Sequence, residues 1–152
     1  MIEYNKIINK NQLQILKNQT AYFKNIKFSF TEKYIDKLAD LLEVKNAIQI
    51  LAEENKKFVG YVAAYENKSF ISNYLFLFEI FVNPFYQHKG IGTNLLVQII
   101  NWAKKKNLQG IIVETEFENI PAQKFYEKNG FARIANPKWN KGITYQLNYV
   151  AK

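Results

Sequence analysis

Residues 75–100 constrain the fold of this chain more than any other stretch, because a strand, a turn, a glycine loop and a helix follow one another directly. The apolar run Leu75–Val82 predicts a buried strand, and Pro84 marks the turn after it. Apolar residues at helical spacing then predict a helix over residues 92–106. A helix N-terminus presents unpaired N–H groups and the positive end of the helix dipole, so this junction suits a phosphate or pyrophosphate.

The loop before this helix is short, basic and contains two glycines. Gly90 and Gly92 have no Cβ to hold an anion away from the backbone, and Lys89 adds a positive charge. The loop is not a Walker A motif, which needs a Lys-Ser/Thr pair after its second glycine, and it lacks the third glycine of a dinucleotide fingerprint. Taken alone, the pattern is equally typical of a tight strand-to-helix turn.

A second pattern follows within residues 110–131. A short apolar strand leads to Asn119-x-x-Ala122, Phe125-Tyr126 and Gly130-Phe131. Together with the loop Gln87-x-x-Gly90-x-Gly92, this pattern resembles the GNAT superfamily of N-acetyltransferases, in which such a loop binds the pyrophosphate of acetyl-CoA. The resemblance covers about residues 58–135. It implies an α/β GNAT fold, with a mixed, mostly antiparallel twisted sheet, a central splayed pair of parallel strands, and helices on both faces.

The resemblance also implies which residues bind acetyl-CoA, the cosubstrate, without a metal. Backbone groups of Ile80, Phe81 and Val82 would bond the pantetheine amides and the thioester carbonyl. The pyrophosphate would lie on the main-chain amides of Gln87, His88, Lys89, Gly90, Ile91, Gly92 and Thr93. Asn119 would bond the pantetheine arm, although its position also predicts an N-cap for the next helix, and both roles can hold together.

Tyr126 matches the tyrosine whose phenol lies beside the cofactor sulfur in the superfamily. A thiolate leaving group must gain a proton, and a phenol with a pKa of about 10 can donate it. The resemblance therefore implies that Tyr126 is the general acid. The alternative is that Phe125 and Tyr126 both pack their helix onto the sheet; we expect Phe125 to do so.

Glu79 is the candidate for the acceptor side of the reaction. An amine is mostly ammonium at neutral pH, and exposing its lone pair costs ~4 kcal/mol, so a carboxylate or an ordered water is needed to take the proton. Glu79 is the lone acid in an apolar strand, where it is costly to bury without a partner or a role. Alternation would equally place it on a face open to solvent. Glu114 and Glu116 are weaker candidates.

The whole chain predicts a single N-acetyltransferase domain over residues 1–152, without internal repeats or a linker. The expected strands lie at residues 2–8, 47–53, 57–65, 70–82, 111–115, 131–135 and 143–149. The expected helices lie at residues 12–18, 31–42, 92–106 and 121–128. Strands 47–53 and 57–65 predict a hairpin, and strand 111–115 a buried parallel neighbour of the strand that ends at Val82.

Composition excludes several classes of site. The chain has no cysteine and one histidine, which excludes disulfides, thiolate metal sites and a cysteinyl acyl-enzyme, and makes a histidine metal site improbable. The formal charge is +8, but all cations except Arg133 are scattered lysines, so we expect attraction for anionic CoA rather than a nucleic-acid partner. No apolar run reaches the ~20 residues of a membrane span, and the N-terminus lacks a signal core. We expect a cytoplasmic protein without a membrane partner; a homodimer stays open.

The acceptor is less constrained than the donor. Residues 101–110 with Glu114-Thr115 look like streptothricin acetyltransferases, but Glu79 stands where that family has Asp, and residues 137–142 have no evident match. We expect direct attack by the primary amine of a small polar molecule, antibiotic-like or polyamine-like. The alternatives are a protein or peptide N-terminal acetyltransferase, a tRNA-acetylating toxin and a non-catalytic acyl-CoA sensor.

Overall fold

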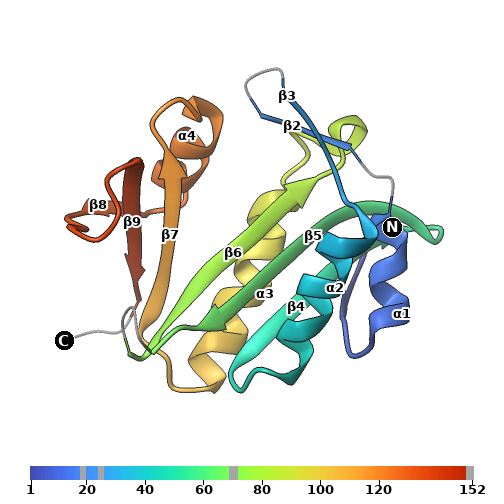
Figure 1. The fold of residues 1–152 in the computed structure, drawn as a ribbon, viewed down its shortest axis with the longest axis horizontal. Coiled ribbons are helices and arrows are strands. Elements are labelled where there is room, and N and C mark those ends of the chain that lie inside the picture. Colours follow the sequence, from blue (N-terminus) through green and yellow to red (C-terminus); the bar gives the residue numbers. More distant parts are fainter. Residues whose placement is uncertain (18–19, 24–25, 69–71, 150–152) are drawn as a thin grey trace.

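The computed structural model describes residues 1–17, 20–23, 26–68 and 72–149, and its centre is a seven-stranded sheet (Figure 1). The strand order is β1-β4-β5-β6-β7-β9-β8. The strands are β1 (Glu3–Lys6), β4 (Ala47–Glu54), β5 (Lys57–Glu66), β6 (Tyr74–Val82), β7 (Gly110–Glu116), β8 (Ala132–Ile134) and β9 (Gly142–Asn148). All neighbours are antiparallel except β6 and β7, which are parallel. The GNAT-like sheet expected from the sequence is confirmed.

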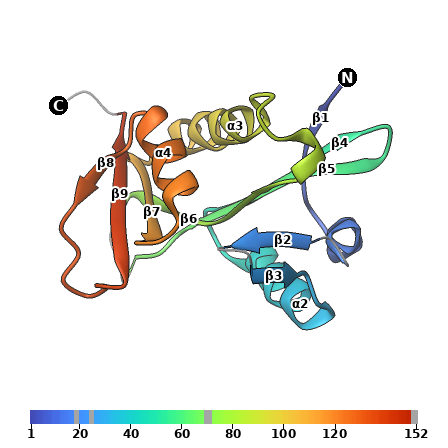
Figure 2. The ribbon, with the colours of Figure 1, turned by 90° about the horizontal axis from the view of Figure 1, so that it is seen from above.

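Helices cover both faces of this sheet, as Figure 2 shows from above. The helices are α1 (Lys10–Leu13), α2 (Glu32–Asp40), α3 (Ile91–Lys105) and α4 (Ile120–Lys128), with 3-10 turns at Gln14–Leu16, Leu41–Glu43 and Pro84–Tyr86. One apolar cluster lies between the sheet and α3 with α4, and includes Leu95, Ile99 and Tyr126. The other lies between the sheet and α1 with α2, and includes Leu13, Ile35 and Leu38. None of the described helices is long and apolar enough to cross a bilayer.

The N-terminal third differs most from the sequence predictions. The first helix begins at Lys10 instead of residue 12, because Asn9 forms a capping box with Gln12, and it changes to a 3-10 turn at Gln14. Its expected end at Asn18 lies outside the described residues. A hairpin of β2 (Thr20–Phe23) and β3 (Ile26–Ser29), which was not predicted, forms a sheet of its own (Figure 1).

Element ends elsewhere move for local reasons. Strand β6 begins at Tyr74, since Asn73 has a φ of +68° that interrupts extended backbone; the first residues of the predicted strand, 70 and 71, lie outside the described residues. Strand β8 is shorter than predicted. Helix α2 has the expected N-cap, because the Thr31 side chain accepts a hydrogen bond from the Tyr34 N–H.

The parallel pair β6–β7 separates after a few residues. Its register runs only from Tyr74 opposite Gly110 to Phe76 opposite Ile112, whereas β6 stays paired with β5 as far as Val82. Phe78 is an extra residue in the β5–β6 ladder, since Ala63 pairs with Glu79 and Ala64 with Leu77. A bulge of this kind bends and twists its strand. The two strands therefore diverge toward the end of the sheet where α4 lies (Figure 1).

Candidate active site

The junction between β6 and α3 presents unpaired backbone donors. Gly90 is the N-cap of α3, with φ +80° and ψ 8°, and no side chain caps the helix. The first helical bond runs from the Asn94 N–H to the Gly90 carbonyl at 3.0 Å, so the N–H groups of Ile91, Gly92 and Thr93 have no acceptor within the helix. His88 also has a positive φ, +64°. These donors and the helix dipole form a potential anion site.

The two glycines of this loop are required for different structural reasons. Gly90 has a φ that L side chains rarely adopt, although a Cβ there would meet nothing within 4 Å. A Cβ on Gly92 would lie 3.1 Å from the Phe125 ring, so this glycine lets α3 approach α4. Phe125 thus packs as expected. The residues from Gln87 to Gly90 are exposed. The side-chain amide of Gln87 donates to the Val82 carbonyl at 3.2 Å.

Three residues of β6 were predicted to bind the cofactor through their backbone, and two of them, Ile80 and Val82, have backbone groups on the open edge of the strand. The Asn83 N–H donates to the Val59 carbonyl at 2.7 Å, which fixes the direction of the peptide groups in this strand. Because these groups alternate, Phe81 points its N–H and C=O toward β5, while Ile80 and Val82 point theirs toward the gap left by β7. The sequence motif alone does not distinguish these three residues.

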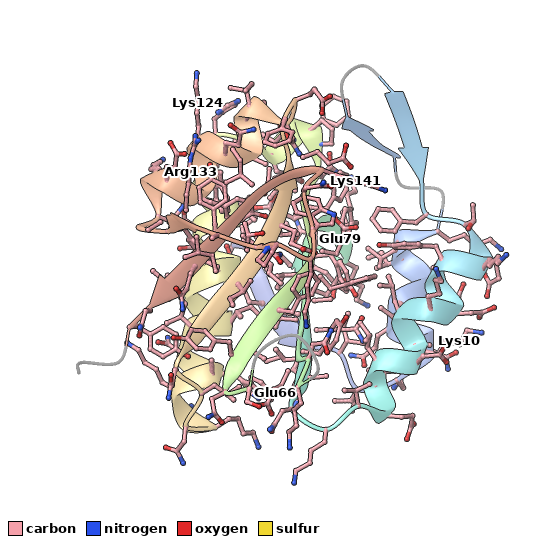
Figure 3. The ribbon with its side chains drawn as sticks, turned by 60° about the vertical axis from the view of Figure 1, so that its left-hand side comes forward. Lys10, Glu66, Glu79, Lys124, Arg133 and Lys141 are labelled. Atoms are coloured by element: carbon pink, nitrogen blue, oxygen red, sulfur yellow. The ribbon has the colours of Figure 1, made fainter. Side chains whose placement is uncertain are left out.

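Glu79 is half-buried on the face of the sheet that α2 covers, and not on a solvent face. Its Oε2 accepts a hydrogen bond from the Tyr34 hydroxyl at 2.9 Å. Burial raises the pKa of this carboxyl, while the hydrogen bonds from Tyr34 and from the Ile80 N–H lower it. Figure 3 shows Glu79 inside the molecule, whereas Lys124 and Arg133 project outward. Tyr34 was predicted only as a helical residue, and its spacing gives no signal of this contact, which joins residues 45 positions apart.

Phe78 and Glu79 lie on the same face although they are adjacent in the sequence. The Phe78 ring stacks on the Tyr34 ring, with centroids 6.4 Å apart and planes at 15°, and Tyr34 also binds Glu79. Regular alternation would place successive side chains on opposite faces. The bulge at Phe78 removes that alternation, which no sequence pattern had indicated.

Tyr126 comes from α4 and is only 5% exposed. Its ring contacts Phe125, Phe131 and Tyr145 at centroid distances of 5.4, 5.4 and 5.9 Å, so it is also a packing residue. Burial, and secondly the charge of Glu79, raise the pKa of the Tyr126 phenol.

The turn between β7 and α4 is held by two amide side chains. The Asn119 Oδ1 accepts from the Ala122 N–H at 3.3 Å, so its predicted N-cap role is confirmed. Gln123 is 7% exposed and donates to the carbonyls of Glu116 and Phe117 at 3.1 and 2.8 Å. Gln123 was not predicted, because a glutamine in a helix gives no sequence signal of such a bond.

The weaker acidic candidates lie on β7, beyond its last pair with β6. Glu114 accepts from Asn136 at 3.1 Å, and burial raises its pKa, while Glu116 is exposed at the end of β7. Among the described residues, no group of three His, Cys, Asp or Glu side chains could hold a metal ion. Two hollows of about 410 Å³ lie elsewhere, one lined by Lys6, Lys106 and Trp102 among others, the second around Lys45 and Tyr65.

Comparison with known proteins gives the family and the fold of this chain. The model of the acetyltransferase (GNAT) family matches residues 13–131. The uncharacterized N-acetyltransferase YhfO of Bacillus subtilis is 32% identical over 113 residues, which cover 73% of this chain and 72% of that protein. Streptothricin acetyltransferase A of Bacillus subtilis is 40% identical over 60 residues, or 40% of this chain and 35% of that protein. A Bacillus anthracis protein crystallised with acetyl coenzyme A has the same fold, with a TM-score of 0.76 and 21% identity over 98% of this chain and all of that one.

Proposed function

Because this chain belongs to the GNAT acetyltransferase family, we propose that it transfers the acetyl group of acetyl-CoA to a primary amine of a small molecule by direct attack. The observation that carries this proposal is the position of Glu79 and Tyr126. Glu79 supplies a carboxyl on β6, the strand that continues beyond its pairing with β7, and Tyr126 supplies a phenol on α4, the helix that follows β7. A transfer to an ammonium acceptor needs one group to take a proton and one to give a proton.

The main chain is suited to hold acetyl-CoA, which supplies the activated acetyl group. The N–H groups of Ile91, Gly92 and Thr93, with the exposed loop before them, would bind its pyrophosphate. The Ile80 carbonyl and the Val82 N–H point toward the gap, and would bond the pantetheine arm and the thioester carbonyl. The Asn119 amide nitrogen would add a donor, since its Oδ1 is occupied by the cap of α4.

Glu79 would take the proton that the ammonium loses before its nitrogen forms the new C–N bond. Burial raises the pKa of this carboxyl, which makes it a stronger base than an exposed glutamate. Tyr34 holds Oε2 and so fixes the orientation of the carboxylate. Both effects come from packing of α2 on the sheet.

Tyr126 would donate its proton to the sulfur as the C–S bond breaks. Its pKa is raised by burial and, secondly, by the negative charge of Glu79. Once Glu79 has taken the ammonium proton, that charge is neutralised and the second contribution disappears. Proton uptake by Glu79 would therefore make Tyr126 a better acid for the step that follows.

The acceptor class, a small polar amine, is the expectation from the sequence, and the partial match to streptothricin acetyltransferase A over 60 residues adds support. Streptothricin-like amines, aminoglycosides and polyamines are accordingly the first compounds to test. Cytoplasmic location stays a prediction of the sequence, and the question of a homodimer stays open.

Two measurements test the proposed function. Calorimetry at low salt should detect binding of CoA to the purified protein. A screen that follows acetyl-CoA consumption with small amines, aminoglycosides, polyamines and N-terminal peptides should find turnover with a small amine. No CoA binding would refute the proposal, and turnover confined to peptides would favour an N-terminal acetyltransferase instead. CoA binding that stays without turnover for every amine and peptide would favour a sensor.

A further inference from the structure

We propose that the acceptor is a primary amine joined by a short chain to a flat apolar ring, and that Phe78 selects it. This inference rests on the proposed acetyl transfer to a primary amine, and it expects a ring-bearing amine in place of the polyamines and aminoglycosides named above. It is carried by three side chains in contact, Tyr34, Phe78 and Glu79. Together they combine one carboxylate with one accessible aromatic ring.

The bulge of β6 brings the ring and the carboxylate together. With regular alternation, Phe78 would point to the face opposite Glu79, toward α3. Instead Phe78 stacks on Tyr34 at 6.4 Å, and the same Tyr34 donates to Glu79 at 2.9 Å. A compound whose ammonium reaches Glu79 would therefore have Phe78 as its neighbour on this face.

Phe78 is exposed where an apolar ring is expected to be covered. The residue is 37% exposed, although it lies in the central strand of the sheet. Tyr65 supports it from β5, with ring centroids 6.2 Å apart, and Phe76 contacts Tyr65 in turn at 5.9 Å. The rings of Tyr34 on α2 and of Tyr65 on β5 thus contact the Phe78 ring, whose remaining surface is apolar and accessible. Such a surface favours a second flat ring.

The test compares three amines on wild-type protein and Phe78 variants. The probes are 2-phenylethylamine, its saturated analogue 2-cyclohexylethylamine, and spermidine. We expect the largest kcat/KM for 2-phenylethylamine and the smallest for spermidine. Phe78→Leu keeps an apolar side chain without a flat ring, and should reduce kcat/KM for 2-phenylethylamine about fivefold, within the range of aromatic stacking. Phe78→Tyr keeps the ring and should retain the preference over the saturated amine.

Two controls separate this inference from the proposed function and from folding. Ile8→Ala removes another exposed apolar side chain, 72% accessible and outside the site, and should leave all three amines unchanged. CoA binding by calorimetry should be equal in wild type and Phe78→Leu. Absence of CoA binding in wild type would refute the proposed function itself.

The remaining outcomes test the role of Phe78 without bearing on the proposed acetyl transfer. A larger kcat/KM for spermidine, or a ring preference that survives in Phe78→Leu, would overturn it. If CoA binds but no amine turns over, equilibrium binding of 2-phenylethylamine to the CoA-bound protein gives the answer. Binding that is weakened in Phe78→Leu supports the inference, and undetectable binding in wild type overturns it.

Discussion

The two sides of the β6–β7 gap are built in different ways. The proposed cofactor side consists of main-chain donors within one short loop and helix start, from Gln87 to Thr93. The proposed acceptor side consists of side chains from separate elements, with Tyr34 on α2 and Glu79 on β6. A site made of main-chain groups depends on local conformation, whereas a site made of side chains depends on how distant elements pack. The first is therefore robust to changes of side chain, and the second is not.

The sharpest test of this difference is the loss of one hydroxyl at the boundary between the two sides. Tyr126→Phe should reduce kcat by about 100-fold, because the proposed proton donor is removed. Affinity for CoA should stay within about twofold, since a main-chain site does not use the phenol. Stopped-flow or steady-state kinetics together with calorimetry would measure both quantities.

Tyr145→Phe is the matched control for that change. Tyr145 contacts the Tyr126 ring, but its hydroxyl donates to Glu127 at 2.6 Å, outside the proposed site. It should leave kcat unaltered. Equal turnover in wild type and Tyr126→Phe would exclude the general-acid role.

The next largest effect should come from backbone conformation at Gly90. Gly90→Val places a β-branched residue at φ +80°, which costs roughly 1–2 kcal/mol, and should weaken CoA binding about tenfold as the loop rearranges. Gly90→Asn is the paired variant, because asparagine tolerates this conformation, and it should bind CoA nearly as wild type does. If both variants bound equally well, the loop would not be the pyrophosphate site.

A smaller effect should distinguish the two roles of Asn119. Asn119→Ala removes the helix cap and should cost about 1 kcal/mol of folding stability. Asn119→Ser keeps a capping oxygen but has no amide nitrogen. If that nitrogen bonds the cofactor, Asn119→Ser should retain its thermal midpoint yet bind CoA a fewfold more weakly. If Asn119→Ser bound CoA as wild type does, Asn119 would have only its role as the helix cap.

The smallest effect concerns stability on the acceptor side. Because burial raises the pKa of Glu79 in the folded protein, the folded state binds more protons than the unfolded state above the ordinary value of 4.5. Stability should therefore fall as pH rises from 4.5 through the folded pKa. Glu79→Gln should lack this loss and be more stable than wild type at neutral pH, although inactive. Urea unfolding at several pH values measures the difference, and a wild-type protein that gains stability across this window would contradict the prediction.

The contrast between the two sides also explains what could be predicted from the sequence. The sheet, the parallel pair and the helices of the C-terminal half follow from local spacing, and so do the positions of Gly90 and Asn119. Tyr34 could not be predicted as a partner of Glu79, since only the packing of α2 on β6 brings them together. The bulge at Phe78 was missed because an uninterrupted apolar run gives no sign of the register change in its partner strand. The hairpin β2–β3 was missed because its residues lack strong turn signals.

The bulge in β6 has a consequence for how a ligand enters. The additional residue, Phe78, bends β6 where its pairing with β7 has ended. The gap between the two strands is therefore part of the folded backbone itself. A thioester carrier arriving from solution would not have to break interstrand hydrogen bonds to be seated. It would then bind to a gap between β6 and β7 that is already open, and its association rate would be limited by diffusion and orientation instead of by a slow conformational opening.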